Sequence, residues 1–87
     1  MRIALDHVSA ESLSDQLSTA LARRIRRGSL APGARLPTVR ALAEELELAP
    51  NTVAKAYRAL EHERLIATLG RRGTFVADRL PERVPGR

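Results

Sequence analysis

The stretch from residue 35 to residue 76 constrains the fold of this chain more than any other. Two short segments, 38–46 and 51–63, place apolar residues at helical spacing and are separated by a tight break that ends in a proline. A basic turn with a glycine at each end, 70–73, follows between two β-prone runs. Neither segment can bury its apolar face alone, so we expect two helices packed against each other with a hairpin beside them.

The boundaries of these two helices carry their own signals. Thr38 is the expected N-cap of the first helix, and it follows a proline that cannot sit inside a helix. Pro50 has no amide proton, a loss that the first turn of a helix tolerates. The second helix is therefore expected to run from about Asn51 to Glu63.

The helix expected at 51–63 has two chemically different faces. At about 100° per residue, its inward face consists of Val53, Ala56, Tyr57 and Leu60. The opposite face consists of side chains that donate hydrogen bonds, Asn51, Lys55, Arg58 and His62. Carboxylates are absent from the N-terminal part of this face, which is what a helix in the major groove of DNA requires. By contrast, Glu44, Glu45 and Glu47 would repel phosphates, so the end of the helix at 38–46 is expected to face away from DNA.

A further helix is expected earlier in the chain, from Ser9 to Arg27. Either Ser9 or Ser12 can cap it, and Gly28 can end it in the left-handed conformation. Its buried stripe recurs every fourth residue, at Leu13, Leu17, Leu21 and Ile25. Four arginines crowd its end, at positions 23, 24, 26 and 27. A solvated helix end that matches the helix dipole is favoured over direct DNA contact for this cluster.

Short strands complete the prediction. The runs 65–69 and 74–77 form the hairpin, Arg35-Leu36 can pair with it, and the alternation in residues 1–7 predicts a strand that pairs with the hairpin or with a partner chain. The fold class is therefore mainly α with a small β-hairpin wing. We expect a winged helix-turn-helix domain over 9–77, with a three-helix core and an antiparallel sheet of two or three strands.

The two ends of the chain are expected to lie outside this domain. Residues 1–8 form an N-terminal arm or short strand. Residues 78–87 contain two prolines and little apolar content, which predicts a flexible tail or the start of a linker.

Composition narrows the classes of function. The 87 residues suffice for one small domain. The net charge is +5, and all cationic residues except Lys55 are arginines, which bind phosphates and guanine edges well. A genome biased towards arginine codons explains this usage equally well. The charge alone therefore indicates only a polyanionic partner, either nucleic acid or a membrane surface.

Other classes are disfavoured. The chain has no cysteine, which removes disulfides and thiolate metal sites and fits a cytoplasmic location. No apolar run approaches the roughly 20 residues of a membrane-spanning helix. His7 and His62 have no catalytic or metal-binding spacing, and Gly70-x-x-Gly73 does not open a helix as a phosphate-binding loop would. We expect no enzyme, no cofactor and no metal.

Several separate motifs resemble one family. Residues 28–40, GSLAPGARLPTVR, resemble the G-x-L-x-P-G-x-x-L-P-[ST]-x-R signature of GntR-type bacterial transcription regulators. Residues 51–53 and 73–76 match later parts of the signature, and 50–58, PNTVAKAYR, is similar to the YtrA-type branch. The resemblance covers about 13–76. It implies a regulator, with repression favoured, that binds double-stranded DNA sequence-specifically as a homodimer on an inverted-repeat operator.

The resemblance also implies roles for individual residues. Arg40 aligns with an arginine that reaches the major groove, Thr38 with a cap that touches phosphate, and Asn51 and Thr52 with contacts at the start of the recognition helix. The basic face of that helix and the wing add further contacts, and Arg35 is expected near the DNA backbone. The expected DNA-binding residues are Arg35, Thr38, Arg40, Asn51, Thr52, Lys55, Arg58, Arg71, Arg72 and Gly73.

The chain departs from the family pattern in four places. Glu47 and Arg64 stand where the family often has glycine, and Ala49-Pro50 stands where Ser-Arg is common. The recognition helix thereby loses a side-chain N-cap, at a cost of about 1 kcal/mol. The residues after Val76 are also too few for the family's C-terminal effector or dimerisation region. We therefore expect either an excised DNA-binding domain or a minimal member, with dimer contacts in a region that is absent or minimal here.

One alternative from another class stays open. A winged-helix domain can also serve as a protein-interaction module, here docking an acidic partner through its basic face. Protein interfaces usually contain aromatic or aliphatic anchors, and the exposed stripe of the helix at 51–63 has none. This alternative is therefore less favoured.

Overall fold

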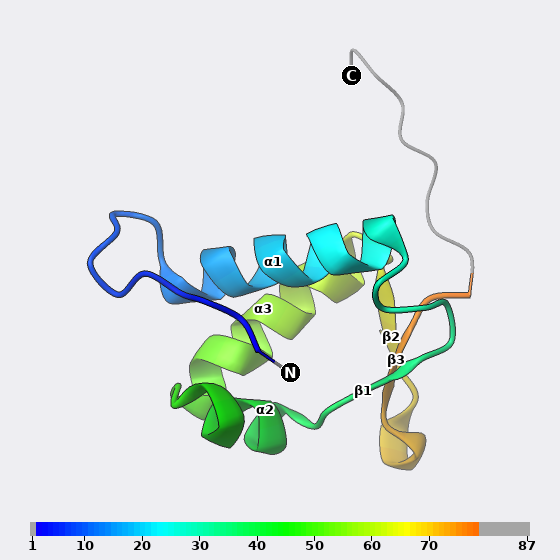
Figure 1. Ribbon diagram of the computed structural model, residues 1–87. Coiled ribbons are helices and arrows are strands. Elements are labelled where there is room, and N and C mark those ends of the chain that lie inside the picture. Colours follow the sequence, from blue (N-terminus) through cyan, green and yellow to red (C-terminus); the bar gives the residue numbers. More distant parts are fainter. Residues whose placement is uncertain (1, 79–87) are drawn as a thin grey trace.

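The computed structural model describes residues 2–78, and these fold into three helices and a three-stranded antiparallel sheet (Figure 1). The helices are α1 (Leu13–Arg27), α2 (Val39–Leu46) and α3 (Pro50–His62). The strands are β1 (Arg35–Leu36), β2 (Ile66–Thr68) and β3 (Thr74–Val76), with a single 3-10 turn, η1 (Gly70–Arg72), at the tip of the hairpin. The predicted fold class is confirmed. The tail expected at 78–87 lies outside the described residues except for Asp78.

The first helix begins later than its sequence predicts. Ser12 is the N-cap, and its hydroxyl accepts a hydrogen bond of 3.1 Å from the amide of Asp15. The alternative start at Ser9 is wrong, because residues 9–12 are not helical; the Ser9 hydroxyl accepts from the amide of Glu11 at 3.1 Å in a local turn. Such a local side-chain bond competes with helix formation. Gly28 ends α1 in the left-handed conformation, with φ of 84°, as expected.

The strand expected at residues 1–7 does not form within the described part of this segment, 2–7. Side chains of α1 occupy the backbone groups that a neighbouring strand would use. Gln16 Oε1 accepts from the amide of Asp6 at 2.7 Å, and Gln16 Nε2 donates to the Asp6 carbonyl at 2.9 Å. Arg24 donates to the carbonyl of Arg2. The arm therefore lies as an extended segment along α1, with Ile3 packed against the core (Figure 1).

The sheet joins the connector before α2 to the hairpin after α3. The strand order is β1-β3-β2, so the expected pairing of Arg35-Leu36 with the hairpin is confirmed. Arg35 lies opposite Phe75, and Ile66 lies opposite Val76. At the tip, Gly70 and Gly73 bracket Arg71 and Arg72 as expected. The tip is the 3-10 turn η1, closed by the Gly73 amide donating to the Gly70 carbonyl at 3.2 Å.

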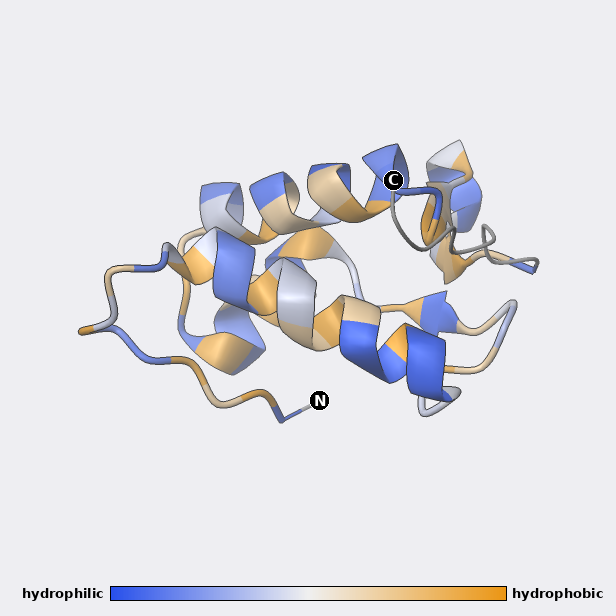
Figure 2. Cartoon of the chain, turned by 90° about the horizontal axis from the view of Figure 1, so that it is seen from above, coloured by the Kyte–Doolittle hydropathy of each residue, from blue (hydrophilic) through white to orange (hydrophobic). Residues whose placement is uncertain are grey.

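The core lies between the three helices and the sheet. Apolar sides of the helices turn towards one another and polar sides turn outwards (Figure 2). The most completely buried side chains come from all three helices and from the segment that enters β2, and they include Leu17, Leu21, Leu42, Val53, Leu60 and Leu65. Within residues 2–78, no helix combines the length and apolar character needed to cross a bilayer.

Candidate nucleic-acid interface

The start of α2 is tied to the middle of α3 by one side chain. Tyr57 is 4% exposed, and its hydroxyl donates a hydrogen bond of 2.7 Å to the carbonyl oxygen of Pro37. Burial away from water raises the pKa of Tyr57 to about 12, so the phenol stays protonated and can donate. This bond positions Thr38 and Arg40 relative to α3.

Two left-handed residues shape the ends of α2 and α3. Glu47 ends α2 with φ of 57°, and the amide of Leu48 then donates to the carbonyl of Ala43 at 2.8 Å. Arg64 follows α3 with φ of 62°, and the amide of Leu65 donates to the carbonyl of Leu60 at 3.0 Å. These are helix-terminating bonds that glycine usually permits. The chain keeps both helix ends although neither residue is glycine.

The two faces of α3 are as predicted. Its buried residues are Val53, Ala56, Tyr57 and Leu60. Asn51, Lys55, Arg58 and His62 are exposed. The helix starts at Pro50, and its N-cap residue Ala49 makes no side-chain capping bond. No side chain therefore satisfies the first turn of α3. Pro50 has no amide proton to satisfy, and the amide of Thr52 donates to the carbonyl of Ala49 at 3.0 Å.

The first turn of α2 presents a hydroxyl and a guanidinium. Thr38 is the N-cap, as predicted, and its Oγ1 accepts from the amide of Ala41 at 3.0 Å. The hydroxyl proton stays available for donation to a phosphate oxygen. Arg40 is exposed two residues further on, and Glu44 is exposed nearer the opposite end of the helix. The helix thus has a basic start and an acidic end.

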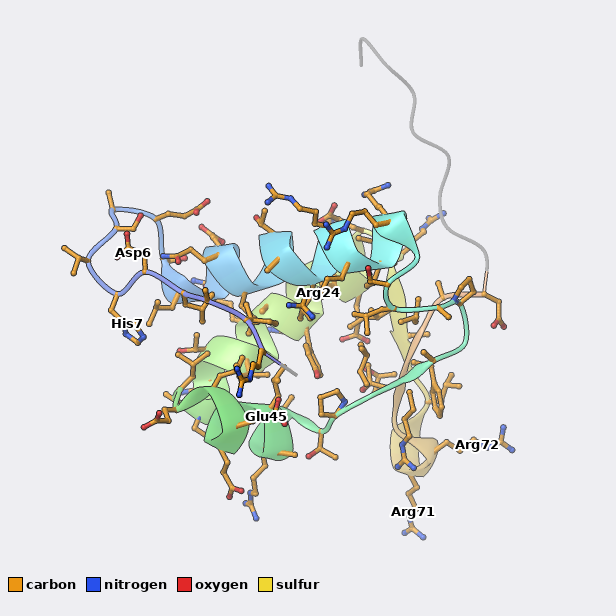
Figure 3. The ribbon with its side chains drawn as sticks, in the orientation of Figure 1. Asp6, His7, Arg24, Glu45, Arg71 and Arg72 are labelled. Atoms are coloured by element: carbon orange, nitrogen blue, oxygen red, sulfur yellow. The ribbon has the colours of Figure 1, made fainter. Side chains whose placement is uncertain are left out.

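The wing carries its own cationic groups. Arg71 and Arg72 are exposed in η1 and project away from the body of the domain (Figure 3). The guanidinium of Arg35 lies against Gly73, where an added Cβ would come within 3.0 Å of Arg35 Nε. Arg35 pairs with Phe75, and Gly73 lies two residues before Phe75 on the same strand segment. Residues two apart point to the same face, so Arg35 and Gly73 share a face of the sheet. Arg35 therefore belongs to the base of the wing.

The expected site residues differ in their exposure to solvent. Thr52 and Gly73 are half-buried, whereas the other eight are exposed. In Figure 1, α2 and the wing turn η1 lie on the side of the molecule away from α1. Sequence reasoning missed two features beside the wing turn: Leu69, which is 50% exposed, and the hydroxyls of Thr68 and Thr74, which lie 3.3 Å apart. Alternation along the strands places Thr68 on the same face as buried Ile66 and Thr74 on the same face as buried Val76. Periodicity therefore gives no sign that this hydroxyl pair lies outside the core, and a leucine at a strand end is likewise normally expected in the core.

The described residues show no arrangement for metal chemistry. Within 2–78, no group of three or more histidine, cysteine, aspartate or glutamate side chains is placed to hold a metal ion. What the surface offers is hydrogen-bond donors and fixed positive charge.

Residues 13–76 match the family described as "Bacterial regulatory proteins, gntR family". The chain belongs to the GntR family. The chain is similar to the HTH-type transcriptional regulator Rv1152 of Mycobacterium tuberculosis, with 48% identity over 75 residues. The matched region covers 86% of this chain and 62% of that protein. The chain is also similar to the HTH-type transcriptional repressor YtrA of Bacillus subtilis, with 38% identity over 76 residues. The matched region covers 87% of this chain and 58% of that protein.

A solved structure extends the likeness to the fold. YtrA from Sulfolobus acidocaldarius, described as a GntR-family transcription factor, aligns with a TM-score of 0.83 and 32% identity. The alignment covers 90% of this chain and 82% of that one. The chain spans about three fifths of the length of the two curated relatives. It carries the winged helix-turn-helix domain of a DNA-binding transcription regulator.

Proposed function

We propose that this GntR domain reads a two-fold symmetric, inverted-repeat operator in double-stranded DNA and that the regulator it serves acts by repression. One observation carries the proposal. The exposed face of α3, Asn51 to His62, offers donors without carboxylates at its N-terminal end, and the Tyr57–Pro37 bond holds the start of α2 beside it. A helix face whose N-terminal end presents donors and cations suits the acceptor groups on the base edges in the major groove.

The proposed roles follow from position. Arg40, Asn51 and Thr52 lie in the first turns of α2 and α3, and we assign them to base or near-base contacts. Thr38 donates its hydroxyl proton to a phosphate. Charged side chains around these turns attract the DNA backbone without reading sequence. This second group consists of Arg35, Lys55, Arg58, Arg71 and Arg72, and Gly73 lets the wing approach the duplex.

A homodimer accounts for a symmetric operator. Two copies related by a two-fold axis would place their recognition helices about 34–36 Å apart, one turn of B-DNA, or a multiple of it. The two relatives are longer than this chain, and the main dimer contacts would lie in sequence of the kind that makes them longer. The name of the Bacillus relative, a transcriptional repressor, supports repression as the outcome. The protein would act in the cytoplasm by binding alone, without cofactor or catalysis.

Selection from a random duplex pool tests the proposal. Fluorescence anisotropy at two salt concentrations would measure binding of the pool, and sequencing of the bound fraction would reveal any motif. Enrichment of an inverted repeat supports a dimeric reader. Enrichment of a single half-site contradicts the dimer but keeps the readout. Salt-sensitive binding without enrichment contradicts the readout. Absence of binding at low salt overturns the proposal and favours a protein-interaction module.

A further inference from the structure

A second basic surface lies on α1. Its last three turns and the end of α3 enclose a shallow hollow of about 500 Å³. The lining residues are Ser18, Thr19, Ala22, Arg23, Arg26, Arg27 and Glu63. We call this surface the α1 hollow. Arg24 does not line it, because its side chain reaches the other way to the carbonyl of Arg2.

The three arginines of the α1 hollow repel one another. Arg23, Arg26 and Arg27 are exposed and stand three and four residues apart, so they are neighbours on one helix face. Like charges at this spacing destabilise a helix. Among residues 2–78, none of the three guanidinium groups has a hydrogen bond or ion pair that would offset the repulsion. The helix dipole favours Arg26 and Arg27 in the last turn, but it acts only weakly on Arg23.

The α1 hollow is separate from the proposed DNA surface. In Figure 1, α1 runs along one side of the molecule, and α2 and η1 lie on the other. The view from above looks directly onto α1 and shows its last turns as strongly hydrophilic (Figure 2). The labelled arginines of the wing point away from α1 (Figure 3). The proposed base-contacting residues lie at the starts of α2 and α3, whereas the α1 hollow meets α3 only beyond its C-terminal end, at Glu63.

We infer that the α1 hollow docks a carboxylate-rich segment of a partner protein. Guanidinium groups bind carboxylates in a bidentate manner, and the hydroxyl of Thr19 adds a donor beside them. The hydroxyl of Ser18 already donates to the carbonyl of Asp15 at 3.0 Å. A membrane surface fits poorly, because Ala22 is the only apolar residue in the lining and membrane-binding helices need large apolar side chains next to their cations. Glu63 is the one carboxylate among the lining residues, so the lining carries three positive charges against one negative charge.

A labelled acidic peptide tests the inference on the full chain. The probe is a short fluorescein-labelled peptide of glutamate and alanine, without phosphate, with binding followed by anisotropy at low salt. Arg23→Gln/Arg26→Gln is expected to weaken peptide binding about tenfold, and Arg71→Gln/Arg72→Gln to change it less than about twofold. Both variants remove two charges from exposed sites, so net charge is matched. Glutamine has a helix propensity close to that of arginine, and circular dichroism would confirm that α1 stays folded.

Binding of a random duplex to the same variants separates the two surfaces. The wing variant should weaken duplex binding, and the α1 variant should leave it nearly unchanged. The inference is overturned by an equal loss of peptide affinity in both variants, because the peptide would then follow net charge only. It is also overturned if the peptide does not bind, or if the α1 variant loses duplex affinity as the wing variant does. Failure of the duplex to bind the unmodified chain would contradict the proposed function, while the peptide measurements would still decide this inference.

Discussion

The hydroxyl of Tyr57 in α3 donates a hydrogen bond of 2.7 Å to the carbonyl oxygen of Pro37, the residue before the N-cap of α2. The bond connects the recognition helix to the segment that carries Thr38 and Arg40. Because Tyr57 is almost fully buried, water cannot replace the lost donor if the hydroxyl is removed. The start of α2 is therefore tied to α3 by a neutral phenol, in addition to the core packing of Leu42 and Ala43.

Tyr57→Phe is expected to lower the free energy of unfolding by about 1–2 kcal/mol, because the Pro37 carbonyl loses its donor. Urea denaturation at neutral pH measures this loss. Duplex binding should weaken as well, since the start of α2 is then less firmly held. An unchanged unfolding midpoint would show that the bond contributes nothing to stability. Val39→Ala, at a half-buried position in the same region, serves as a packing control.

The same residue predicts a dependence of stability on high pH. Burial raises the pKa of Tyr57 from 10.0 to about 12, so the unfolded chain loses this proton before the folded chain does. The stabilisation is fully present below pH 10 and is lost as pH rises from 10 to 12, by about 2–3 kcal/mol in total. The stability of the Tyr57→Phe variant lacks this component. Denaturation of both proteins between pH 8 and pH 12 should therefore show converging stabilities, and parallel curves would contradict the assignment.

Glycine at the two left-handed helix ends is expected to stabilise the domain. Glu47→Gly and Arg64→Gly should each raise the free energy of unfolding by about 0.5–1 kcal/mol, because the cost of the left-handed conformation exceeds the entropy that glycine loses. Gly28→Ala provides the opposite case. Its φ is 84°, and an added Cβ meets nothing within 4 Å, so only backbone strain can destabilise it. Thermal unfolding would refute this account if all three substitutions shifted the midpoint in the same direction.

The wing depends on Gly73 more than on Gly70. Gly73 has φ of 108° and ψ of −165°, a region that is almost restricted to glycine, and its Cβ position lies 3.0 Å from Arg35 Nε. Gly73→Ala should cost about 1–3 kcal/mol of stability and displace the Arg35 side chain, which weakens duplex binding. Gly70→Ala, at φ of 58° and with open space around it, should cost about 1 kcal/mol. Equal losses in urea denaturation would remove the special role of Gly73.

Periodicity and capping chemistry account for most of the predicted fold. The inward face of α3, Thr38 as a cap and Pro50 in the first turn all express local rules, and the structure confirms each of them. The pairing of β1 with β3 can also be predicted from the sequence, because the hairpin leaves one edge strand free to pair.

Other features depend on contacts between distant residues. The arm alternates as a strand would, but Gln16, on a helix ten residues later, binds its backbone instead. The bond between Tyr57 and Pro37 and the contact of Arg35 with Gly73 likewise join segments that the chain order keeps apart. Helical spacing placed Tyr57 inward without revealing which acceptor its hydroxyl meets. The ten expected DNA-binding residues remain a prediction, because their roles depend on a duplex.

The central claim is that Arg40 reads bases whereas Arg72 binds phosphate. With an operator from the selection experiment, anisotropy would measure the affinity of Arg40→Ala and Arg72→Ala for operator and for random duplex at one salt concentration. Arg40→Ala should lower the ratio of operator to random affinity, by about 1–3 kcal/mol in free energy. Arg72→Ala should weaken binding to both duplexes similarly and reduce the salt dependence. An equal loss on both duplexes from Arg40→Ala would contradict the proposed readout.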